Sequence, residues 1–435
     1  MEGARKDMHV VVVTIGSAGD LFPFMRMAIA LVDAGHRVSF LGPHQHEPFV
    51  RAAGLPFHGL PADPAVLDHP DLWHPTRGFG VVWQATRPAM AEVPAFVGSL
   101  PPDQKCTMLV HPLALPEADL CRAARPGISV AVAFLAPSNL PTVYDPLMMG
   151  PWRVPRWVPH GVRRRLWRGL GRRFVDPVAL PGVNAARALA GLAPIDALID
   201  TLLSIADLSI ALFPDWFAPT QPDWPQPLVR SSFPLYDPSP DPSPDPGPDP
   251  GPRAALSPEL LRFLGQGGRP LVFTPGTGNR QARAYFEHAA AAAHLLGERA
   301  IFLTPHRDQL PSELPRHVLW QEYVPLRALL PHVCVLVHHG GIGTTAEALR
   351  AGTRQLVVPM AHDQFDNGAR VEALGVGVSL PATRLSTGRL VKCLGRLLDD
   401  EGLAVRCRAV AGKFGSDPGV DEVVVALEVL AGLSR

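Results

Sequence analysis

The sequence has few cysteines, no long apolar run and no excess charge of either sign. Its five cysteines, at positions 106, 121, 334, 393 and 407, form no C-x-x-C pair, so neither a disulfide framework nor a zinc site is expected. No apolar run reaches about 18 residues and no apolar signal region precedes the first strand, which predicts a cytoplasmic protein that crosses no membrane. Lys and Arg together number 40, as do Asp and Glu, so no overall field favours a nucleic-acid partner.

The length and the proline distribution predict two domains. With 435 residues, 47% of them hydrophobic, the chain can fill two cores. Proline stands at every second position in residues 237–252. Because proline fixes φ and removes a hydrogen-bond donor, this stretch is predicted to be an extended spacer. We therefore expect an N-terminal domain over residues 1–236 and a C-terminal domain over residues 253–435.

Short apolar runs alternate with helical patterns in both halves. The predicted strands are residues 8–15, 37–41, 55–60, 108–110 and 128–134 in the first half, and 270–274, 300–303, 318–321 and 335–337 in the second. The predicted helices include residues 21–34, 279–296, 384–399 and 421–433. Strands that alternate with helices predict α/β domains built on parallel sheets.

The segment Val335–Leu349, VLVHHGGIGTTAEAL, is typical of a strand, a glycine turn and a helix. Gly340, Gly341 and Gly343 supply the turn, and the helix is predicted over residues 344–350. Such a turn leaves free N–H groups aimed at one point, with the positive end of the helix dipole behind them. It predicts an anion site, most naturally for phosphate. The alternative to an anion site is a tight turn in which both histidines make their hydrogen bonds within the protein.

Four side chains at this turn can donate hydrogen bonds to a phosphate oxygen. His338 and His339 stand at its mouth, and Thr344 and Thr345 add hydroxyl groups in the first helical turn. One unit later, the segment Val357–Asn367 is predicted to run from a buried strand through a polar loop into a helix.

That polar loop places Asp363 and Gln364 at the carboxyl end of a strand, where ligands bind in doubly wound sheets. A carboxylate and an amide suit the hydroxyl groups of a sugar. A phosphate cradle beside an Asp–Gln pair therefore predicts a site for a sugar diphosphate.

The motifs HHGGIGTT (338–345) and PMAHDQFDN (359–367) resemble the donor signature of inverting nucleotide-sugar glycosyltransferases, the family of plant, macrolide and sterol enzymes. The resemblance implies the α/β GT-B fold, two Rossmann-like parallel-sheet domains facing a central cleft, with the last helix crossing back to the first domain. It implies a UDP- or dTDP-linked sugar as co-substrate and no other cofactor. It also implies no metal, and the Asp-x-Asp metal motif of the other large glycosyltransferase fold does not occur in the sequence.

The same resemblance assigns further donor-binding residues. Gly276 and Thr277 match the pair that lies against the diphosphate in the family, and His338 is expected to stabilise the departing diphosphate. Tyr323 matches the aromatic residue that stacks on the nucleotide base, and Val324 belongs to the segment whose backbone pairs with the edge of that base.

The catalytic base is expected in the motif Gly16–Asp20, GSAGD, which follows the first strand. The structural alternative is that this carboxylate only caps the N-terminus of the helix. Within the resemblance, however, Asp20 is the first choice for the base that deprotonates the acceptor hydroxyl. His111, at the end of a later strand, is the second choice, and His36 is expected to be structural.

Four segments resemble one branch of the family, the rhamnosyltransferases of rhamnolipid synthesis: residues 71–75, 78–84, 211–228 and 232–237. This branch implies transfer of L-rhamnose from dTDP-L-rhamnose to an apolar lipid acid, a 3-hydroxyalkanoyloxy-alkanoate. Three alternatives stay open: a UDP-glucose-type transferase acting on a phenolic, sterol or polyketide acceptor, a nucleotide-sugar epimerase, and a catalytically silent homologue.

Residues 152–174 combine eight arginines with three tryptophans. The pattern favours a solvated helix whose tryptophans pack inward. The alternative is a peripheral contact with the inner face of a membrane, because interleaved Arg and Trp residues are typical of such interfaces.

Overall fold

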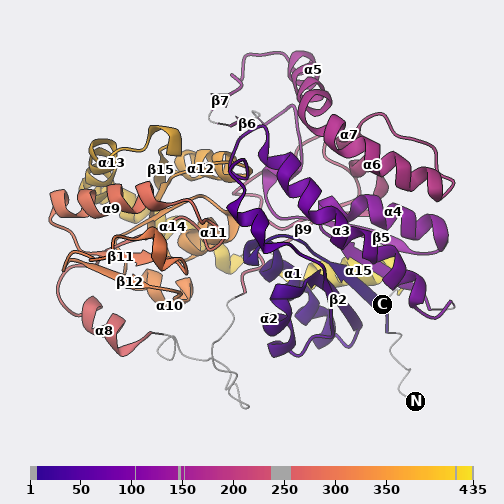
Figure 1. The fold of residues 1–435 in the computed structure, drawn as a ribbon, viewed down its shortest axis with the longest axis horizontal. Coiled ribbons are helices and arrows are strands. Elements are labelled where there is room, and N and C mark those ends of the chain that lie inside the picture. Colours follow the sequence, from indigo (N-terminus) through magenta and orange to yellow (C-terminus); the bar gives the residue numbers. More distant parts are fainter. Residues whose placement is uncertain are drawn as a thin grey trace. The chain divides into compact units, whose positions relative to one another are not determined.

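The computed structural model describes residues 7–102, 104–145, 148–150, 152–236, 256–416 and 419–433. The chain divides into two compact units (Figure 1). The N-terminal unit comprises Met1–Tyr236 together with Asp417–Arg435, and the C-terminal unit comprises Asp237–Ser416. The predicted spacer, residues 237–252, lies outside the described residues.

Seven described strands of the N-terminal unit form a parallel sheet in the order β3-β2-β1-β4-β5-β8-β9. Their bounds are β1 His9–Val13, β2 Arg37–Pro43, β3 Phe57–Leu60, β4 Cys106–Val110, β5 Ser129–Phe134, β8 Leu208–Ala211 and β9 Leu228–Arg230. Two short strands, β6 Met148–Met149 and β7 Trp152–Arg153, form a separate antiparallel pair. β1, with four consecutive valines, is buried along its whole length, as parallel strands covered by helices on both faces are. The strand order reverses direction between β1 and β4.

The described strands of the C-terminal unit form a six-stranded parallel sheet in the order β12-β11-β10-β13-β14-β15. Their bounds are β10 Leu271–Thr274, β11 Ala300–Leu303, β12 Val318–Gln321, β13 Val335–His338, β14 Arg354–Val357 and β15 Gly377–Ser379. This is the dinucleotide-binding strand order, and it reverses between β10 and β13. The two sheets confirm the predicted class of two parallel-sheet α/β domains.

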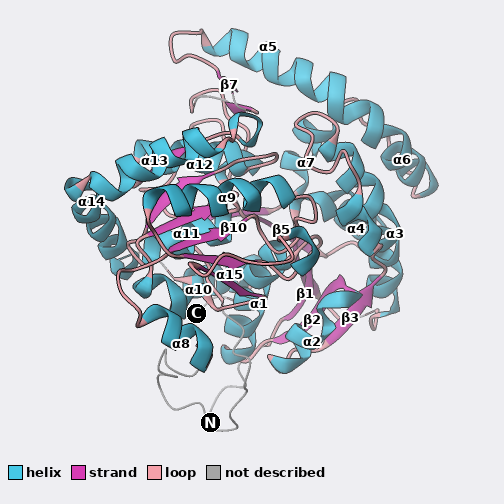
Figure 2. Cartoon of the chain, turned by 60° about the vertical axis from the view of Figure 1, so that its left-hand side comes forward, coloured by secondary structure: helices cyan, strands magenta, loops and turns pink. Residues whose placement is uncertain are grey.

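Helices cover the strands of each unit (Figure 2). In the N-terminal unit they are α1 Ala18–Asp33, α2 Glu47–Ala52, α3 Gly78–Ser99, α4 Leu115–Ala124, α5 His160–Leu170, α6 Asp176–Leu189, α7 Leu198–Ile205 and α15 Val420–Leu430. In the C-terminal unit they are α8 Pro258–Leu264, α9 Arg283–Leu296, α10 Leu326–Leu329, α11 Ile342–Arg350, α12 Gln364–Ala373, α13 Thr387–Asp399 and α14 Glu401–Ala411. Within the described residues, no helix is both long and apolar enough to span a bilayer.

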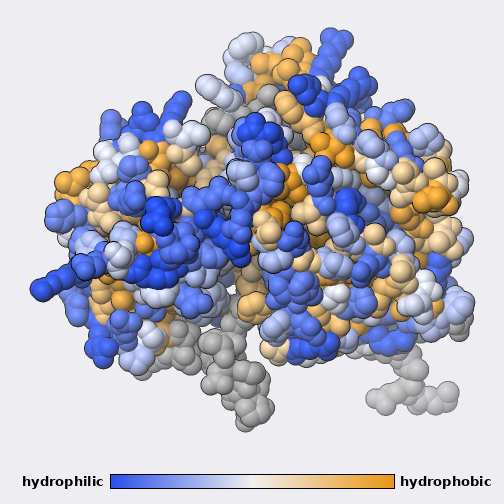
Figure 3. All heavy atoms as spheres, viewed as in Figure 1, coloured by the Kyte–Doolittle hydropathy of each residue, from blue (hydrophilic) through white to orange (hydrophobic). Residues whose placement is uncertain are grey.

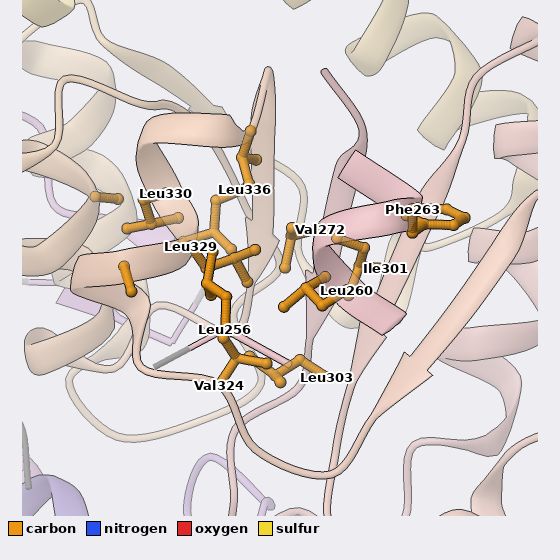
Figure 4. Close-up of a cluster of buried hydrophobic side chains, with 13 residues drawn as sticks. Leu256, Leu260, Phe263, Val272, Ile301, Leu303, Val324, Leu329, Leu330 and Leu336 are labelled. Atoms are coloured by element: carbon orange, nitrogen blue, oxygen red, sulfur yellow. The ribbon is translucent and has the colours of Figure 1, made fainter. Parts of the chain in front are cut away.

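One face of the second sheet packs against α8 and α10 through a cluster of buried hydrophobic side chains (Figure 4). Leu260 of α8 and Leu329 of α10 are fully buried beside Val272 and Ile301 from the strands. A buried side chain of this size stabilises the fold by about 1.5–3 kcal/mol relative to an exposed one. This cluster packs on Val272 of β10 and Leu336 of β13, the two strands from which the glycine turns start.

The last helix, α15, belongs to the N-terminal unit and packs on α1. His36 Nε2 and a carboxylate oxygen of Glu428 lie 3.1 Å apart, and both residues are buried. Leaving either polar group buried without its partner would cost free energy, so this contact ties the end of the chain to the first sheet.

Candidate active site

The structure assigns His338 a supporting place. It is the last residue of β13 and is fully buried. Its Nδ1 accepts a hydrogen bond from Gly340 N at 3.2 Å, and its Nε2 lies 3.0 Å from Gln355 Oε1. Because Nδ1 accepts, Nε2 carries the proton and donates. Burial lowers the pKa of His338 to about 3, which keeps the ring neutral. Both nitrogens are thus used inside the unit, where His338 holds the glycine turn; its contact with the diphosphate stays a prediction.

The neighbouring His339 differs from His338 in its hydrogen bonding. It is only partly buried, yet its Nδ1 is enclosed and has no hydrogen-bond partner among the described residues. Burial lowers the pKa of His339 to about 4, so the ring is neutral and carries one N–H donor. A buried polar nitrogen without a partner is costly, so a ligand that accepted a hydrogen bond there would relieve the cost. His339 was named at the turn from the sequence, but not as the preferred phosphate contact.

Two glycines make room for the His339 ring. A Cβ atom on Gly276 would lie 2.9 Å from His339 Cε1, and one on Gly341 would lie 2.4 Å from His339 Nε2. Gly276 follows β10 and Gly341 follows β13, so the ring fills the space between the two glycine turns. These turns leave adjacent strands where the strand order reverses, the usual ligand crevice of a doubly wound sheet.

The helix that begins at this crevice is α11, with Gly341 at its N-cap. The first N–H groups of an α-helix have no partner within the helix, so those of Gly343 and Thr344 can bind an anion. The Thr344 side chain is partly exposed, whereas Thr345 is buried and its hydroxyl donates back to Gly341 O at 3.0 Å. Of the two threonines, Thr344 is the one available to a ligand.

The turn after β10 is held by residues that the sequence did not single out. The buried Asn279 donates through its N–H to Gly276 O at 3.2 Å, and its own carbonyl accepts from Gln309 Nε2 at 2.7 Å. Thr277 is exposed at the tip of the turn, and its carbonyl lies 3.2 Å from His306 Nε2. The one sequence feature that could have indicated the role of Asn279 is its place as a polar residue directly after the glycines of this turn.

The Asp363–Gln364 pair lies at the start of α12, and both side chains are partly engaged. Asp363 Oδ2 accepts from Asn367 Nδ2 at 2.7 Å. Gln364 is buried, and its Oε1 accepts from Met360 N at 2.8 Å and from Ala361 N. Asn367, missed in the sequence, is fully buried and also donates to Gly340 O at 2.9 Å. It therefore joins the Asp–Gln loop to the glycine turn.

Gly340 lies close to the Asp363–Gln364 loop. Its φ of +94° favours glycine, and a Cβ atom there would lie 2.6 Å from Val357 Cγ1 and 3.0 Å from Gln364 O.

The predicted nucleotide-base segment follows β12. Tyr323 is 49% exposed, while the Val324 side chain is buried in the core cluster, so only the backbone of Val324 can meet a ligand.

In the N-terminal unit, Asp20 is at once a helix cap and a candidate base. Helix α1 begins at Ala18, three residues before the predicted start, because Ser17 and Asp20 form a capping box. Pro23 consequently lies inside the helix and not in its first turn. Asp20 Oδ2 accepts from Ser17 N at 2.9 Å and from Ser17 Oγ at 3.3 Å. Oδ1 has no hydrogen bond within the described residues and can accept a proton.

Burial raises the pKa of Asp20 to about 6, against the two Ser17 hydrogen bonds, which lower it. The carboxylate is therefore mostly ionised near neutral pH but is a stronger base than an ordinary Asp. Gly16, with a φ of +84°, permits this approach, because a Cβ there would lie 2.2 Å from Asp20 Oδ2. His46 Nε2 lies 3.0 Å from Gly16 O and holds the turn, a contact that no motif in the sequence predicted.

His111 follows β4, and its backbone N–H donates to Val13 O at the end of β1. It therefore lies at the same reversal of the strand order as the Asp20 turn. Its Nδ1 accepts from Leu113 N at 3.2 Å, and burial lowers its pKa to about 4. The ring is therefore neutral with the proton on Nε2. In this tautomer His111 can donate a hydrogen bond but has no free nitrogen to take a proton.

Among the described residues, no group of three or more His, Cys, Asp or Glu side chains is arranged to hold a metal ion. The five cysteines are free thiols.

Two domain families match the chain. Residues 10–97 match the glycosyltransferase family 28 N-terminal domain, and residues 289–430 match the erythromycin biosynthesis protein CIII-like C-terminal domain. The chain is 28% identical over 450 residues to an O-mycaminosyltylonolide 6-deoxyallosyltransferase of Streptomyces fradiae, covering 97% of each chain.

Solved structures support the fold. A glycotransferase of kitacinnamycin superposes with a TM-score of 0.71 at 18% identity, covering 98% of this chain and 100% of the other. The spinosyn rhamnosyltransferase SpnG complexed with thymidine diphosphate gives a TM-score of 0.62 at 20% identity, covering 97% and 100%. These comparisons confirm the glycosyltransferase part of the resemblance; the likeness to the rhamnolipid branch stays a prediction.

Proposed function

Because the chain is a glycosyltransferase with the GT-B fold, we propose that it transfers a 6-deoxyhexose from a thymidine diphosphate (dTDP) donor to a hydroxyl group of an apolar acceptor. The observation that carries this proposal is the unpartnered His339 ring between two glycine turns at the reversal of the second sheet. The sugar class is supported by the names of two similar proteins, a 6-deoxyallosyltransferase and a rhamnosyltransferase complexed with thymidine diphosphate.

The C-terminal unit is proposed to bind the donor. The diphosphate accepts hydrogen bonds from His339, from the first N–H groups of α11 and from the Thr344 hydroxyl. Thr277 adds a donor from the turn after β10. The base stacks on Tyr323, and the Gln364 NH₂ group and the Asp363 carboxylate meet the sugar hydroxyls. His338, Asn279 and Asn367 contribute indirectly, because they hold these turns in place.

The N-terminal unit is proposed to activate the acceptor. Asp20 Oδ1 takes the proton of the acceptor hydroxyl as general base, while Oδ2 stays bound to Ser17. His111 donates its Nε2–H to the same acceptor oxygen and stabilises the charge that develops there. This division of roles follows from the tautomer that Leu113 imposes on His111.

The reaction is proposed to be a single displacement. The acceptor oxygen forms a bond to the anomeric carbon as its proton passes to Asp20. The bond from that carbon to the diphosphate breaks, and the nucleoside diphosphate leaves with the electron pair. Negative charge that grows on the leaving group is stabilised by His339 and the N-terminus of α11. Because attack and departure occur on opposite faces, the product has inverted configuration.

A donor and acceptor panel tests this proposal. Purified protein is given dTDP-L-rhamnose, dTDP-glucose or UDP-glucose, each with and without an acceptor, and nucleoside diphosphate release is measured. The acceptors are a 3-hydroxyalkanoyloxy-alkanoate, a polyketide aglycone and a sterol.

The proposal expects release that requires an acceptor and is fastest with dTDP-L-rhamnose, the 6-deoxyhexose of the panel. With the lipid acid as the preferred acceptor, the protein belongs with the rhamnolipid enzymes. Faster release from UDP-glucose contradicts the proposed donor. Release that is equal without any acceptor contradicts transfer and favours an epimerase or hydrolase, and no release at all favours a silent homologue.

A further inference from the structure

The segment from Trp152 to Phe174 in the N-terminal unit, here called the arginine-rich surface, is the most unevenly charged part of the described chain. It carries eight arginines and no Asp or Glu, although the whole sequence has equal numbers of basic and acidic residues. Seven of the eight arginines are exposed. Within the described residues only Arg168 of these seven forms an ion pair, with Asp200 at 3.5 Å. Six exposed guanidinium groups therefore have no acidic partner within the part of the chain that the structure describes.

The eighth arginine fixes this surface to the unit. Arg163 is 1% exposed, and its guanidinium group donates to Val143 O at 2.8 Å and to Pro155 O at 3.2 Å. The surface is thus anchored through a buried side chain, and three of the exposed arginines, Arg164, Arg165 and Arg168, lie on α5.

Helix α5 and the turn after it also carry an apolar stripe. Val162, Leu166, Leu170 and Phe174 recur every four residues, which places them along one side of the helix. They line one continuous groove that is almost entirely apolar, with Arg165 and Arg173 beside it. In Figure 3, apolar side chains near the position of α5 in Figure 1 are bordered by hydrophilic ones.

The tryptophans do not all pack inward, contrary to the interpretation that the sequence pattern favoured. Trp167 is partly buried, but Trp152 is 70% exposed and Trp157 is 82% exposed. Large exposed indoles are unusual on a surface that only meets water, and they are typical of the boundary between lipid headgroups and acyl chains.

We propose that the arginine-rich surface docks on an anionic membrane surface. Helix α5 lies in the plane of the interface, its apolar stripe and the two exposed indoles enter the headgroup region, and the arginines contact lipid phosphates. Charge complementarity favours lipid phosphate, because six of the seven exposed guanidinium groups have no acidic partner among the described residues, and Arg164, Arg165 and Arg168 flank the apolar stripe on α5. The inference does not depend on the donor, the acceptor or the catalytic residues.

The test is co-sedimentation of the full chain with vesicles. One set contains phosphatidylglycerol and phosphatidylcholine in equal parts, and the other contains phosphatidylcholine alone. The charge variant replaces three exposed arginines of the surface, R164Q/R165Q/R172Q. A matched control replaces three exposed arginines of the C-terminal unit, R262Q/R316Q/R408Q, with the same change in net charge. A W152S/W157S variant tests the apolar contribution, and thermal melts confirm that each variant folds.

The wild-type protein and the control are expected to sediment with the anionic vesicles and not with the neutral ones. Each basic residue at an anionic surface changes partitioning about fivefold, so the charge variant should bind roughly 100-fold more weakly. Raising the ionic strength from about 0.1 M to about 1 M should release the protein, because the screening length falls from about 10 Å to about 3 Å. The tryptophan variant should also bind more weakly, even though its charge is unchanged.

Three results would overturn the proposal. If the wild-type protein stays in the supernatant with anionic vesicles, the surface does not bind membranes, and a protein partner becomes the explanation for its exposed arginines. Equal binding to neutral vesicles would remove the role of the arginines. Equal loss in the charge variant and the matched control would show that overall charge, and not this surface, governs binding.

Discussion

Replacing Gly341 with alanine should remove the diphosphate contact of His339 without straining the backbone. Gly341 has φ −58° and ψ 141°, a conformation that alanine adopts freely. The new methyl carbon, however, would lie 2.4 Å from His339 Nε2, about an ångström closer than a van der Waals contact allows. The imidazole ring must move, because the methyl group is fixed to the backbone.

The expected loss follows from the hydrogen bond that His339 supplies. A hydrogen bond to a charged group contributes roughly 1.5–3 kcal/mol, so kcat/KM should fall about 10- to 100-fold and dTDP should bind more weakly. Overpacking should also lower the free energy of unfolding by roughly 1–3 kcal/mol, with a fall in Tm of about 2–4 °C per kcal/mol. Steady-state kinetics, dTDP titration and thermal melts measure the three quantities.

A double-mutant cycle separates the clash from a general loss of structure. H339A alone should lose as much activity as G341A. The combination G341A/H339A should recover the lost stability, because the clashing ring is gone, yet should be no less active than H339A. G395A is the matched control: it lies in α13, and a Cβ atom there would meet nothing within 4 Å. Wild-type activity in G341A, or additive losses in the combination, would refute the reasoning about His339.

Three further predictions concern the N-terminal unit. The pH profile of kcat/KM should be flat above about pH 7 and fall tenfold per pH unit below the Asp20 pKa of about 6, because only the ionised carboxylate accepts a proton. A midpoint near pH 4 would contradict the assignment of Asp20 as the base. The D20N variant should be nearly inactive. H111F should lose only about 3- to 10-fold in kcat/KM and keep the same pH midpoint, whereas a loss above about 100-fold would make His111 the base. E428A should lower the free energy of unfolding by roughly 1–3 kcal/mol in a denaturant titration, because His36 Nε2 loses its buried partner, while the exposed E422A on the same helix should change it by less than about 0.5 kcal/mol.

The strands that carry the candidate site were predictable, because each is a short apolar run that leads into glycine or a polar turn. β1, β10 and β13 lie within or close to the predicted ranges. β8 and β9 were not predicted: β8 follows the apolar helix α7 almost directly, and β9 is short and stands between proline-rich stretches. β15 was missed because it has only three residues, and α14 because it has little contrast between its faces.

The roles of the two turn histidines could not be read from the sequence. Neighbouring residues of a strand point to opposite sides, so one of the pair had to face the core. Which one depends on where the strand ends, and β13 ends at His338. The partners Gln355, Asn279 and Asn367 were likewise hidden, because each acts through a contact with a residue distant in the sequence.

The anomeric configuration of the product tests the central claim most directly. The purified protein would be supplied with a dTDP-6-deoxyhexose of known configuration and an apolar alcohol, and the product would be examined by NMR. A glycoside with inverted configuration, formed by wild-type protein and lost in D20N, is the result that this account predicts. A glycoside with retained configuration, or an altered donor sugar with no glycoside, would contradict it.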